Sequence, residues 1–398
     1  MTKNNTLVLI SMFLSCIGMF IFFPFITSFI TFSLGIEEAS VGTLLGISIF
    51  IGNVSALLFS LNCKPNKERW LFTLSIFFFI ASIGGMFVIS LNGTIAIATL
   101  LIGLISLYRF AIGIYFNSSR ALQMRYLSDR ESSTTLLSNI KLINSIAAGL
   151  GPVIGQYILS QHGYSILFGT SIVLFFLAFV PLLKTEKLSL SDGSESNKKR
   201  SFSIIKEKWF ALSCLSGTLH FIFEAQIYTY LIFKANSKGI EGAIPAIFTT
   251  NSIALVSVGL LWIKYIGDIN RHYVWIATAS LFSLSAVLMV NWVESIYALI
   301  FISFVFSLGE FVSPQLRLDY ASDSELDKLS VISVHNFFTG ALGMSLGFAL
   351  GGYLYSLNNV VLESTAWILV YCISVLLLHK SKTLKQDRGE LITYKYMK

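Results

Sequence analysis

Twelve long apolar segments constrain the fold of this chain more than any other feature of its sequence. A helix needs about 20 apolar residues to cross the hydrocarbon layer of a membrane, and each segment has roughly this length. Backbone polar groups in lipid must be satisfied within the segment, so helices are the expected structure. The segments lie at 7–31, 41–61, 70–90, 94–119, 134–159, 164–183, 209–233, 243–263, 273–292, 295–316, 330–356 and 361–379. The sequence therefore predicts an all-α integral membrane protein with twelve transmembrane helices.

The composition excludes several other classes of protein. Charged residues make up 12% of the 398 residues, about half the fraction of an ordinary soluble domain, and apolar residues make up 55%. The four cysteines are far apart and form no C-x-x-C pair, so we expect neither a disulfide framework nor a metal site. No nucleotide-binding loop or catalytic motif occurs, which argues against direct use of ATP and against an enzyme.

The basic residues are distributed unevenly between the segments that connect the predicted spans. With the N-terminus inside, 24 of the 28 lysines and arginines fall on the inner side, whereas only Lys234 and Lys238 fall in outer loops. Short loops rich in positive charge stay in the cytoplasm. We therefore expect a multi-pass protein of the bacterial inner membrane with both termini cytoplasmic. The net charge of +7 then reflects topology and not nucleic-acid binding.

A polar segment rich in Ser, Lys and Glu, 184–208, separates the sixth and seventh spans and is typical of a linker. It divides the chain into an N-terminal bundle, 1–183, and a C-terminal bundle with a cytoplasmic tail, 209–398. Each bundle contains six of the twelve predicted spans.

Short repeats indicate that the two bundles are pseudo-symmetric. The sequence SLGIEE after the first span recurs as SKGIEG after the seventh span, at an offset of 204 residues. In the same way, Gly151 and Gly155 of the fifth span correspond to Gly347 and Gly351 of the eleventh span, at an offset of 196. Repeats in the expected order at near-constant offsets are typical of transporters built from two similar halves.

Two motifs resemble a known family. The fourth span reads LYRFAIGIYFNSSRA, where Arg109 is followed four residues later by Gly113. The fifth span reads AAGLGPVIGQ, which is similar to the signature G-x-x-x-G-P-x-x-G-G in Gly151, Pro152 and Gly155. On these motifs the chain resembles the major facilitator superfamily, and within it the twelve-span drug:proton antiporters. The resemblance implies a monomer of two six-helix bundles around a central cavity that opens alternately to each side.

Another family motif is altered. The loop after the second span should read G-x-x-x-D-R-x-G-R-R, but here FSLNCKPNKER has Cys63 at the acidic position and Asn66 at a glycine position. The corresponding loop of the second half, GDINRH, keeps Asp268 and Arg271. The resemblance implies a gating role for these last two residues.

Small residues in the fifth span are expected to let it bend and slide during transport. Glycines permit close helix contact, and proline removes one backbone hydrogen-bond donor. These conformational residues are Gly149, Gly151, Pro152 and Gly155.

Placing an ionisable side chain within the bilayer costs free energy, so such residues are candidates for a functional role. Glu224 in the seventh span is the leading proton-coupling residue, because desolvation favours the neutral acid and lets it exchange a proton near neutral pH. His220 lies one turn earlier on the same face. Glu310 in the tenth span is either a second proton site or a brace to Arg317. A hydrogen-bonded packing cluster is the alternative for His220 and Glu224.

Four polar side chains within the spans are candidates for substrate binding: Arg109, Asn117, Lys141 and Gln226. A guanidinium stays charged and holds carboxylates by two parallel hydrogen bonds, so Arg109 is expected to bind an anionic group or to couple to a protonatable acid. The alternatives are a structural pair for Arg109 and, for Lys141, a side chain that extends to the membrane surface.

These features together predict a secondary active transporter. We expect proton-coupled export of a small organic amphiphile, such as a drug or a carboxylated, siderophore-like metabolite. The proton gradient supplies the energy and no cofactor is required, so the partners are the substrate, protons and the lipid bilayer. Two alternatives remain open. One is uptake by proton symport, and the other is a transporter-like receptor that binds its ligand without transport.

Overall fold

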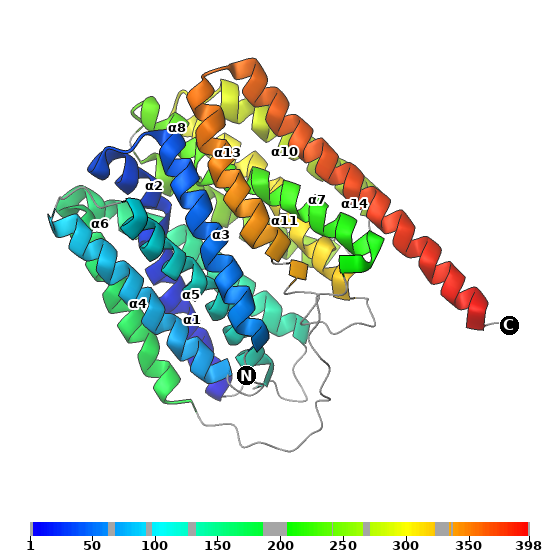
Figure 1. Ribbon diagram of the computed structural model, residues 1–398, viewed down its shortest axis with the longest axis horizontal. Helices are drawn as coiled ribbons and strands as arrows, with labels where there is room; N and C mark the ends of the chain where they lie inside the picture. Colours follow the sequence, from blue (N-terminus) through cyan, green and yellow to red (C-terminus); the bar gives the residue numbers. More distant parts are fainter. Residues whose placement is uncertain are drawn as a thin grey trace.

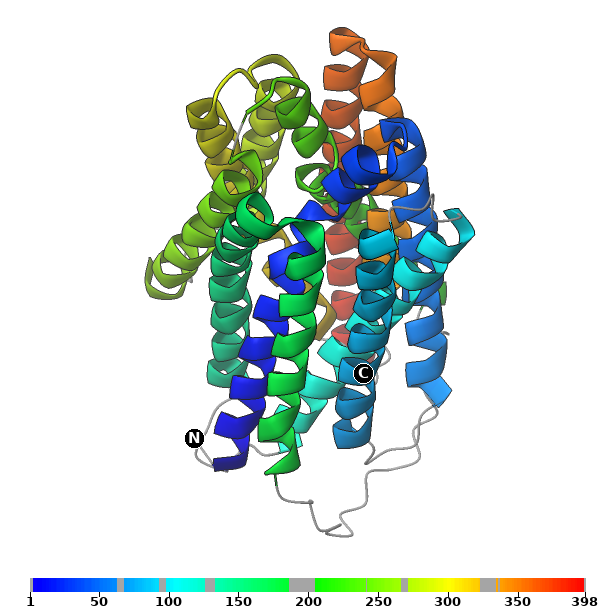
Figure 2. The same cartoon turned by 90° about the vertical axis from the view of Figure 1, so that its left-hand side faces the viewer.

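A computed structural model of the chain describes residues 3–62, 68–92, 98–125, 133–185, 205–240, 242–265, 271–322, 334–335 and 337–396. Nearly all of these residues are helical, and they contain no strand. The helices form one elongated bundle in which most run roughly parallel or antiparallel to one another (Figures 1 and 2). The prediction of an all-α fold is therefore confirmed.

Each predicted span has a helical counterpart. The first half contains α1 (Lys3–Phe22), η1 (Phe23–Phe25), α2 (Ile26–Ser28), η2 (Phe29–Ser33), α3 (Glu38–Asn62), α4 (Glu68–Asn92), α5 (Ala98–Arg125) and α6 (Ser133–Leu183). The second half contains α7 (Lys208–Glu224), η4 (Ala225–Ile227), α8 (Tyr230–Ser237), α9 (Ala243–Tyr265), α10 (Arg271–Asn291), α11 (Ile296–Ser322), η5 (Phe337–Gly343), α13 (Met344–Leu357) and α14 (Val360–Tyr396).

Length and hydropathy support membrane crossing for these helices. Eight segments of the described chain are long and apolar enough to cross a bilayer. One of them, 143–183 in α6, covers most of the fifth predicted span and all of the sixth, with the break in the helix at Gly163 between them. Three shorter apolar helices coincide with the eighth, ninth and tenth predicted spans. Large apolar side chains such as Phe77, Phe176 and Phe301 are exposed on the outside of the bundle, as expected for contact with lipid.

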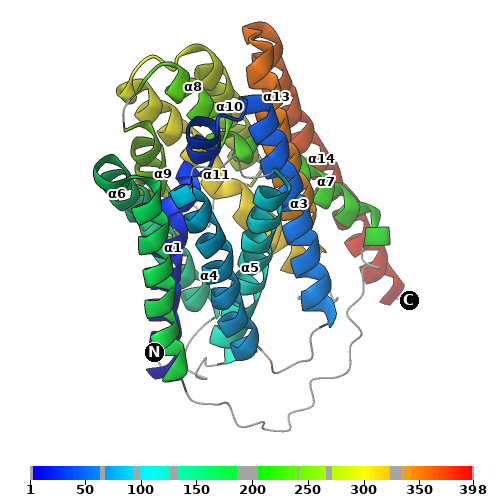
Figure 3. The same cartoon turned by 60° about the vertical axis from the view of Figure 1, so that its left-hand side comes forward.

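Both chain ends lie at the same end of the bundle (Figures 1 and 3). We call it the terminal end, and we call the opposite end, which carries Gly35 and Gly239, the distal end. A chain whose ends lie on one side of a membrane crosses it an even number of times, in agreement with twelve spans. The linker predicted at 184–208 lies mostly outside the described residues.

The turns at the distal end explain one of the sequence repeats. Gly35 and Gly239 have φ angles of 67° and 65°, a conformation that residues with a Cβ atom rarely adopt. After each glycine an isoleucine N–H returns to the preceding helix, from Ile36 to the Ile30 carbonyl (3.4 Å) and from Ile240 to the Ala235 carbonyl (3.1 Å). The repeated Gly-Ile pair therefore forms a helix-ending turn that occurs once in each half.

The glycine repeat has the same structural meaning in both halves. A Cβ atom on Gly151 would lie 2.6 Å from the Cβ of Phe20 in α1, and one on Gly347 would lie 2.6 Å from the Ile222 carbonyl in α7. Gly155 and Gly351 pack in the same way, one turn further along, against the first span and the seventh span. The fifth and eleventh spans thus pack on the first helix of their own halves, which confirms that the two bundles are pseudo-symmetric.

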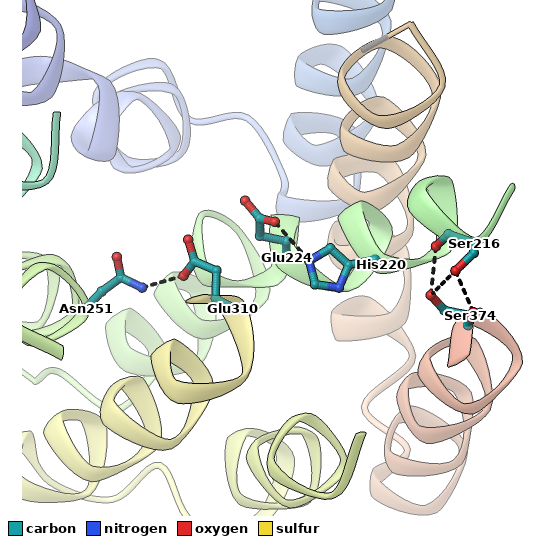
Figure 4. A network of polar contacts seen from close by, with 6 residues as sticks. All are labelled: Ser216, His220, Glu224, Asn251, Glu310 and Ser374. Carbon is teal, nitrogen blue, oxygen red and sulfur yellow. Dashed lines mark hydrogen bonds and ion pairs between the residues drawn. The ribbon is translucent and has the colours of Figure 1, made fainter. Parts of the chain in front are cut away.

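Serine hydroxyls join the first and last helices within each half. In the first half Ser11 donates to the Ala178 carbonyl at 2.7 Å, and Ser171 donates to the Gly18 carbonyl. In the second half Ser374 donates to the Ser216 carbonyl at 2.7 Å (Figure 4). Ser381 donates to the Trp209 carbonyl at 2.5 Å. Such bonds between helices help to hold each six-helix bundle together, because the lipid hydrocarbon offers no competing hydrogen-bond donors.

The two halves meet along two helix pairs, α3 with α13 and α6 with α9. The first pair is close enough that a Cβ atom on Gly42 would lie 2.6 Å from the Phe348 carbonyl oxygen. Hydrogen bonds between the halves join described residues at the distal end and near the middle of the bundle. They run from Thr27 Oγ1 to the Tyr228 carbonyl (3.2 Å), from Asn236 Nδ2 to Ser28 Oγ (3.2 Å), from Thr249 Oγ1 to the Gly149 carbonyl (3.0 Å) and from Asn53 Nδ2 to the Gly340 carbonyl (2.8 Å).

Candidate functional site

The first helix of each half is interrupted at a corresponding position. In the first span α1 gives way to the 3₁₀ turn η1, which contains Pro24, and in the seventh span α7 gives way to the 3₁₀ turn η4 immediately after Glu224. Proline lacks the N–H that would continue the α-helical ladder, which accounts for the first break. Paired interruptions in the two halves of a transporter are the best structural pointer to its binding site.

An acid and a base lie together at the interruption of the seventh span. Nε2 of His220 is 3.4 Å from Oε2 of Glu224, one turn further along α7 (Figure 4). The imidazole is fully buried, whereas 15% of the carboxylate side chain is exposed. The exposed fraction allows Glu224 to exchange a proton, and His220 provides an adjacent partner that carries a charge only when it is protonated.

A second carboxylate comes from α11. Oε2 of Glu310 accepts a hydrogen bond of 2.6 Å from Nδ2 of Asn251 in α9, and the same amide nitrogen donates to Ser307 Oγ at 2.9 Å. Figure 4 shows the carboxyl groups of Glu224 and Glu310 between Asn251 and His220. Three helices of the second half, α7, α9 and α11, therefore contribute to one polar cluster.

Tyr228 connects this cluster to the first half. Its hydroxyl lies within electrostatic range of Glu224, Glu310 and Arg109. The ring packs between the two halves, with its centroid 5.7 Å from the Phe23 ring of η1 and 6.2 Å from the Phe348 ring of α13. Tyr228 is thus close both to Glu224 and Glu310 of the second half and to Arg109 of the first half.

Arg109 of α5 is the cation of the first half at this point. The residue is only 8% exposed, and its guanidinium carbon lies 4.4 Å from the Phe23 ring centroid and 5.9 Å from that of Phe348. Among the described residues, no group lies within hydrogen-bond distance of its Nε or Nη2 atoms. A buried guanidinium whose faces meet aromatic rings is stabilised by cation–π attraction but still lacks a counterion.

This geometry can be compared with known proteins. The family model described as Major Facilitator Superfamily matches residues 8–347, which is most of the chain. The chain belongs to the major facilitator superfamily. It is a multi-pass membrane transporter, so a small molecule is its substrate and a lipid bilayer is its environment.

This superfamily member is similar to the following proteins of known name. The multidrug resistance protein MdtH of Blochmanniella floridana is 24% identical over 391 residues, a match that spans 91% of this chain and 90% of the relative. The solved structure of the nucleoside transporter NupG has a TM-score of 0.71 at 13% identity and covers 96% of this chain and 99% of its own. A POT family transporter in complex with a thioalcohol-conjugated peptide has a TM-score of 0.73 at 11% identity and covers 97% and 96%. At these identities the two structures show a common fold.

Gln226 lies in the polar stretch of the seventh span but does not face the cluster. It is fully buried, and its Nε2 donates to the carbonyls of Ile222 (2.6 Å) and Gly347 (2.9 Å). Its Oε1 accepts a bond of 3.4 Å from Thr229 Oγ1. Because these bonds engage both ends of the amide, the geometry favours a bridge to α13 over the substrate contact that we predicted.

The small residues of the fifth span divide between two contacts. Gly151 and Gly155 pack on the first span of their own half, whereas a Cβ atom on Gly149 would lie 2.9 Å from the Cβ of Ser252 in α9 of the other half. Pro152 is buried within α6. Of the glycines predicted to form a moving seam, only Gly149 faces the partner bundle.

Several predicted residues fall outside the described parts. Asp268 is not among the described residues. Asn117 lies in α5, Lys141 in α6 and Arg271 at the start of α10, but their side chains are not described, and the same holds for Arg317 in α11. The predictions for these side chains remain predictions.

Other residues of the site were missed in the sequence analysis. Asn251 and Asn53 each make a central hydrogen bond, yet attention to ionisable groups alone passed over them. Both residues could have been predicted from the presence of a side-chain amide within an apolar span, because a buried amide requires hydrogen-bond partners. The aromatic rings of Phe23 and Phe348 carried no such signal, since they lie among 34 phenylalanines.

The altered loop after the second span keeps one interpretable contact. Nη2 of Arg69, at the start of α4, donates to the carbonyls of Leu182 (3.0 Å) and Leu183 (3.4 Å) at the end of α6. A cation at a helix C-terminus satisfies free carbonyls and opposes the negative end of the helix dipole. Arg69, which directly follows the motif positions, thus joins two helices of the first half.

Proposed function

We propose that this superfamily member is a proton-coupled exporter of a small organic amphiphile in the bacterial inner membrane, with both termini in the cytoplasm. A drug or a carboxylated metabolite fits this description. The observation that carries the proposal is the acid–base pair of His220 and Glu224, which lies beside Glu310 where the seventh span is interrupted. The 24% identity to a multidrug resistance protein supports export as the direction.

The cluster offers a means of exchanging a proton for a substrate. When Glu224 is protonated it is neutral, and the desolvation cost of its charge is removed. When it loses the proton, the carboxylate is stabilised by His220 at 3.4 Å and lies within range of Tyr228. Glu310, held by Asn251, is the second carboxylate on which a proton can reside. A substrate that binds next to these groups changes their protonation, which is the requirement for coupling.

The contacts that join the two halves support a mechanism of alternating access. The hydrogen bonds between halves that involve Thr27, Asn236 and Thr249 hold the distal end together. With the termini in the cytoplasm, this conformation is the one that closes the outer side. Export then requires these contacts to separate while the two bundles rock about the central site.

Direction is tested with membrane vesicles of both orientations. In inverted vesicles with an acidic lumen, an exporter accumulates its substrate, either a fluorescent drug or a radiolabelled aromatic acid, because protons leave the lumen as the substrate enters. Uptake by symport instead accumulates substrate in right-side-out vesicles with an acidic exterior. Accumulation only in the second preparation would refute export.

Uptake by proton symport is the second candidate, because the loop after the second span departs from the antiporter motif. Cys63 replaces its acid, and Arg69 contacts the end of α6 within the same half. Because this contact of Arg69 stays within the first half, it does not link the two halves at the cytoplasmic side. The inner gate that the family motif usually forms there is therefore incomplete. The same vesicle experiment decides between the two directions.

A further inference from the structure

We propose that the Nε–Nη2 edge of Arg109 is the subsite for the carboxylate group of an aromatic organic acid. The inference rests on the proposed function in that this acid is the transported substrate. It adds to that proposal the chemical class of the substrate and the atoms that recognise it.

The two unsatisfied atoms of Arg109 lie on one edge of the guanidinium. Nε–H and one N–H of Nη2 point in parallel directions, and together they form the fork that binds both oxygens of a carboxylate. Neither atom has a partner among the described residues, although the residue is 92% buried. A buried donor pair of this shape is costly unless a matching acceptor arrives.

The described residues do not supply that acceptor in this conformation. Glu224 pairs with His220, and Glu310 accepts from Asn251. No ion pair joins Arg109 to a carboxylate of the described residues. The counterion that the buried guanidinium requires is therefore provided by a ligand.

The surroundings of Arg109 define the rest of the ligand. Phe23 of the first half and Phe348 of the second half lie against the guanidinium at 4.4 and 5.9 Å, and the Tyr228 ring is stacked near Phe348 at an interplanar angle of 19°. These rings give the guanidinium apolar, aromatic surroundings, which match an aromatic ligand body. The contacts described at this point include no second lysine or arginine, which matches a single carboxylate better than a phosphate dianion.

The test measures binding to the full chain in lipid nanodiscs, in the absence of any gradient. The probes are three acids and their amides: benzoate and benzamide, phenylacetate and phenylacetamide, and indole-3-acetate and indole-3-acetamide. For at least one pair we expect the acid to bind at least tenfold more tightly than the amide, because only the carboxylate matches the charged fork. Inorganic sulfate at equal ionic strength should compete poorly.

Variants of Arg109 test whether this residue causes the preference for the acid over the amide. Arg109→Gln should reduce the ratio of acid to amide affinity to within about twofold, and Arg109→Lys, which keeps the charge but loses the fork, should reduce it at least threefold. Thermal unfolding shows whether each variant folds, and Arg109→Lys keeps the test valid if Arg109→Gln does not fold. Equal binding of acid and amide in all three pairs, equal competition by sulfate, or an undiminished preference in Arg109→Lys would overturn the proposal.

Glu224→Gln separates this inference from the proposed function. It should keep the preference for the acid, because Glu224 is not part of the fork, and loss of the preference in Glu224→Gln would contradict the assignment to Arg109. If vesicles show no proton flux while the preference for acids remains, proton coupling fails and the carboxylate subsite stands.

Discussion

Nε2 of His220 lies 3.4 Å from Oε2 of Glu224, and the buried imidazole thereby shields one side of a carboxylate that remains partly exposed. The i,i+4 spacing places both side chains on one face of α7, and the helix is interrupted immediately afterwards by η4. The interruption leaves Glu224 at the end of the regular helix, within electrostatic range of Tyr228, whose hydroxyl also lies within range of Arg109. This carboxylate therefore lies close to the interface between the two halves, where Tyr228 packs against Phe23.

Replacing His220 with Gln tests the role of the imidazole. Glutamine keeps hydrogen bonding but cannot carry a charge, so we expect substrate-driven proton flux to fall by about tenfold, as for loss of one charge-assisted contact. Substrate binding should change by less than about threefold. Flux is measured in proteoliposomes with a pH-sensitive dye inside. His162→Gln, an exposed histidine of α6, is the control and should behave as the wild type. Wild-type flux in His220→Gln would show that the imidazole only packs.

Asn251→Ala tests the support of the second carboxylate. The substitution removes the 2.6 Å bond to Glu310 and the 2.9 Å bond to Ser307. Loss of a buried hydrogen-bond partner should lower the free energy of unfolding by about 1–3 kcal/mol. Denaturant titration in detergent micelles measures it. Asn291→Ala, which removes an exposed amide bonded to the Val287 carbonyl and, at 3.3 Å, to Ser364 Oγ, should cost less than about 0.5 kcal/mol, because water can replace both bonds. Equal effects of the two variants would refute a supporting role for Asn251.

Much of the fold could be predicted from the sequence because lipid imposes simple requirements. Segment length determines the twelve spans, and the repeats that contain Gly35 and Gly239 follow from a turn that only glycine adopts easily. The contact partners of the fifth span could not be predicted in the same way. Gly149, Gly151 and Gly155 are alike in sequence, but their positions around the helix differ, and only packing shows which of them faces the other half.

Only the ionisable residues of the candidate site could be predicted from the sequence. Ionisable residues within apolar spans pointed to Arg109, Glu224 and Glu310, because such groups are rare at that depth. Gln226 was assigned to the substrate, although in the structure it bonds to backbone carbonyls. A polar side chain next to a helix interruption can satisfy the backbone or face a ligand, and its sequence position does not distinguish these outcomes.

Gly155→Ala tests the packing of the fifth span on the first. The added methyl group would meet the Ile21 carbonyl and, at 2.8 Å, the Phe25 ring, so the backbones must separate. We expect the free energy of unfolding to fall by about 1–3 kcal/mol, as for other overpacked sites. Gly169→Ala in the same helix is the matched control, because its nearest neighbour, Phe87, lies 3.7 Å away, an ordinary contact. Thermal melting of both variants in detergent gives the comparison, and an unchanged melting temperature in Gly155→Ala would contradict the described packing.

A cross-link between the two halves tests their separation during transport. Ser28 Oγ and Asn236 Nδ2 are 3.2 Å apart at the distal end, so Ser28→Cys with Asn236→Cys should be joined by a short bifunctional thiol reagent in a background without the native cysteines. The cross-link should stop transport, and reductive cleavage should restore it.

A pair within one half is the control for this cross-link. Ser90 and Ser165, whose hydroxyls are 3.1 Å apart, both belong to the first bundle, so cross-linking Ser90→Cys to Ser165→Cys should leave transport unchanged. Continued transport with Ser28→Cys cross-linked to Asn236→Cys would exclude separation of the distal end as a step of the cycle.

Proton coupling through Glu224 is tested most directly with the purified protein in proteoliposomes that carry an imposed pH gradient. Internal pH is recorded while candidate drugs and aromatic acids are added to the wild type, to Glu224→Gln, and to Glu294→Gln, an exposed acid at the distal end that is the control. We predict that substrate drives proton flux in the wild type and in Glu294→Gln, and that Glu224→Gln binds substrate but moves no protons. Substrate-driven flux of wild-type magnitude in Glu224→Gln would contradict the account.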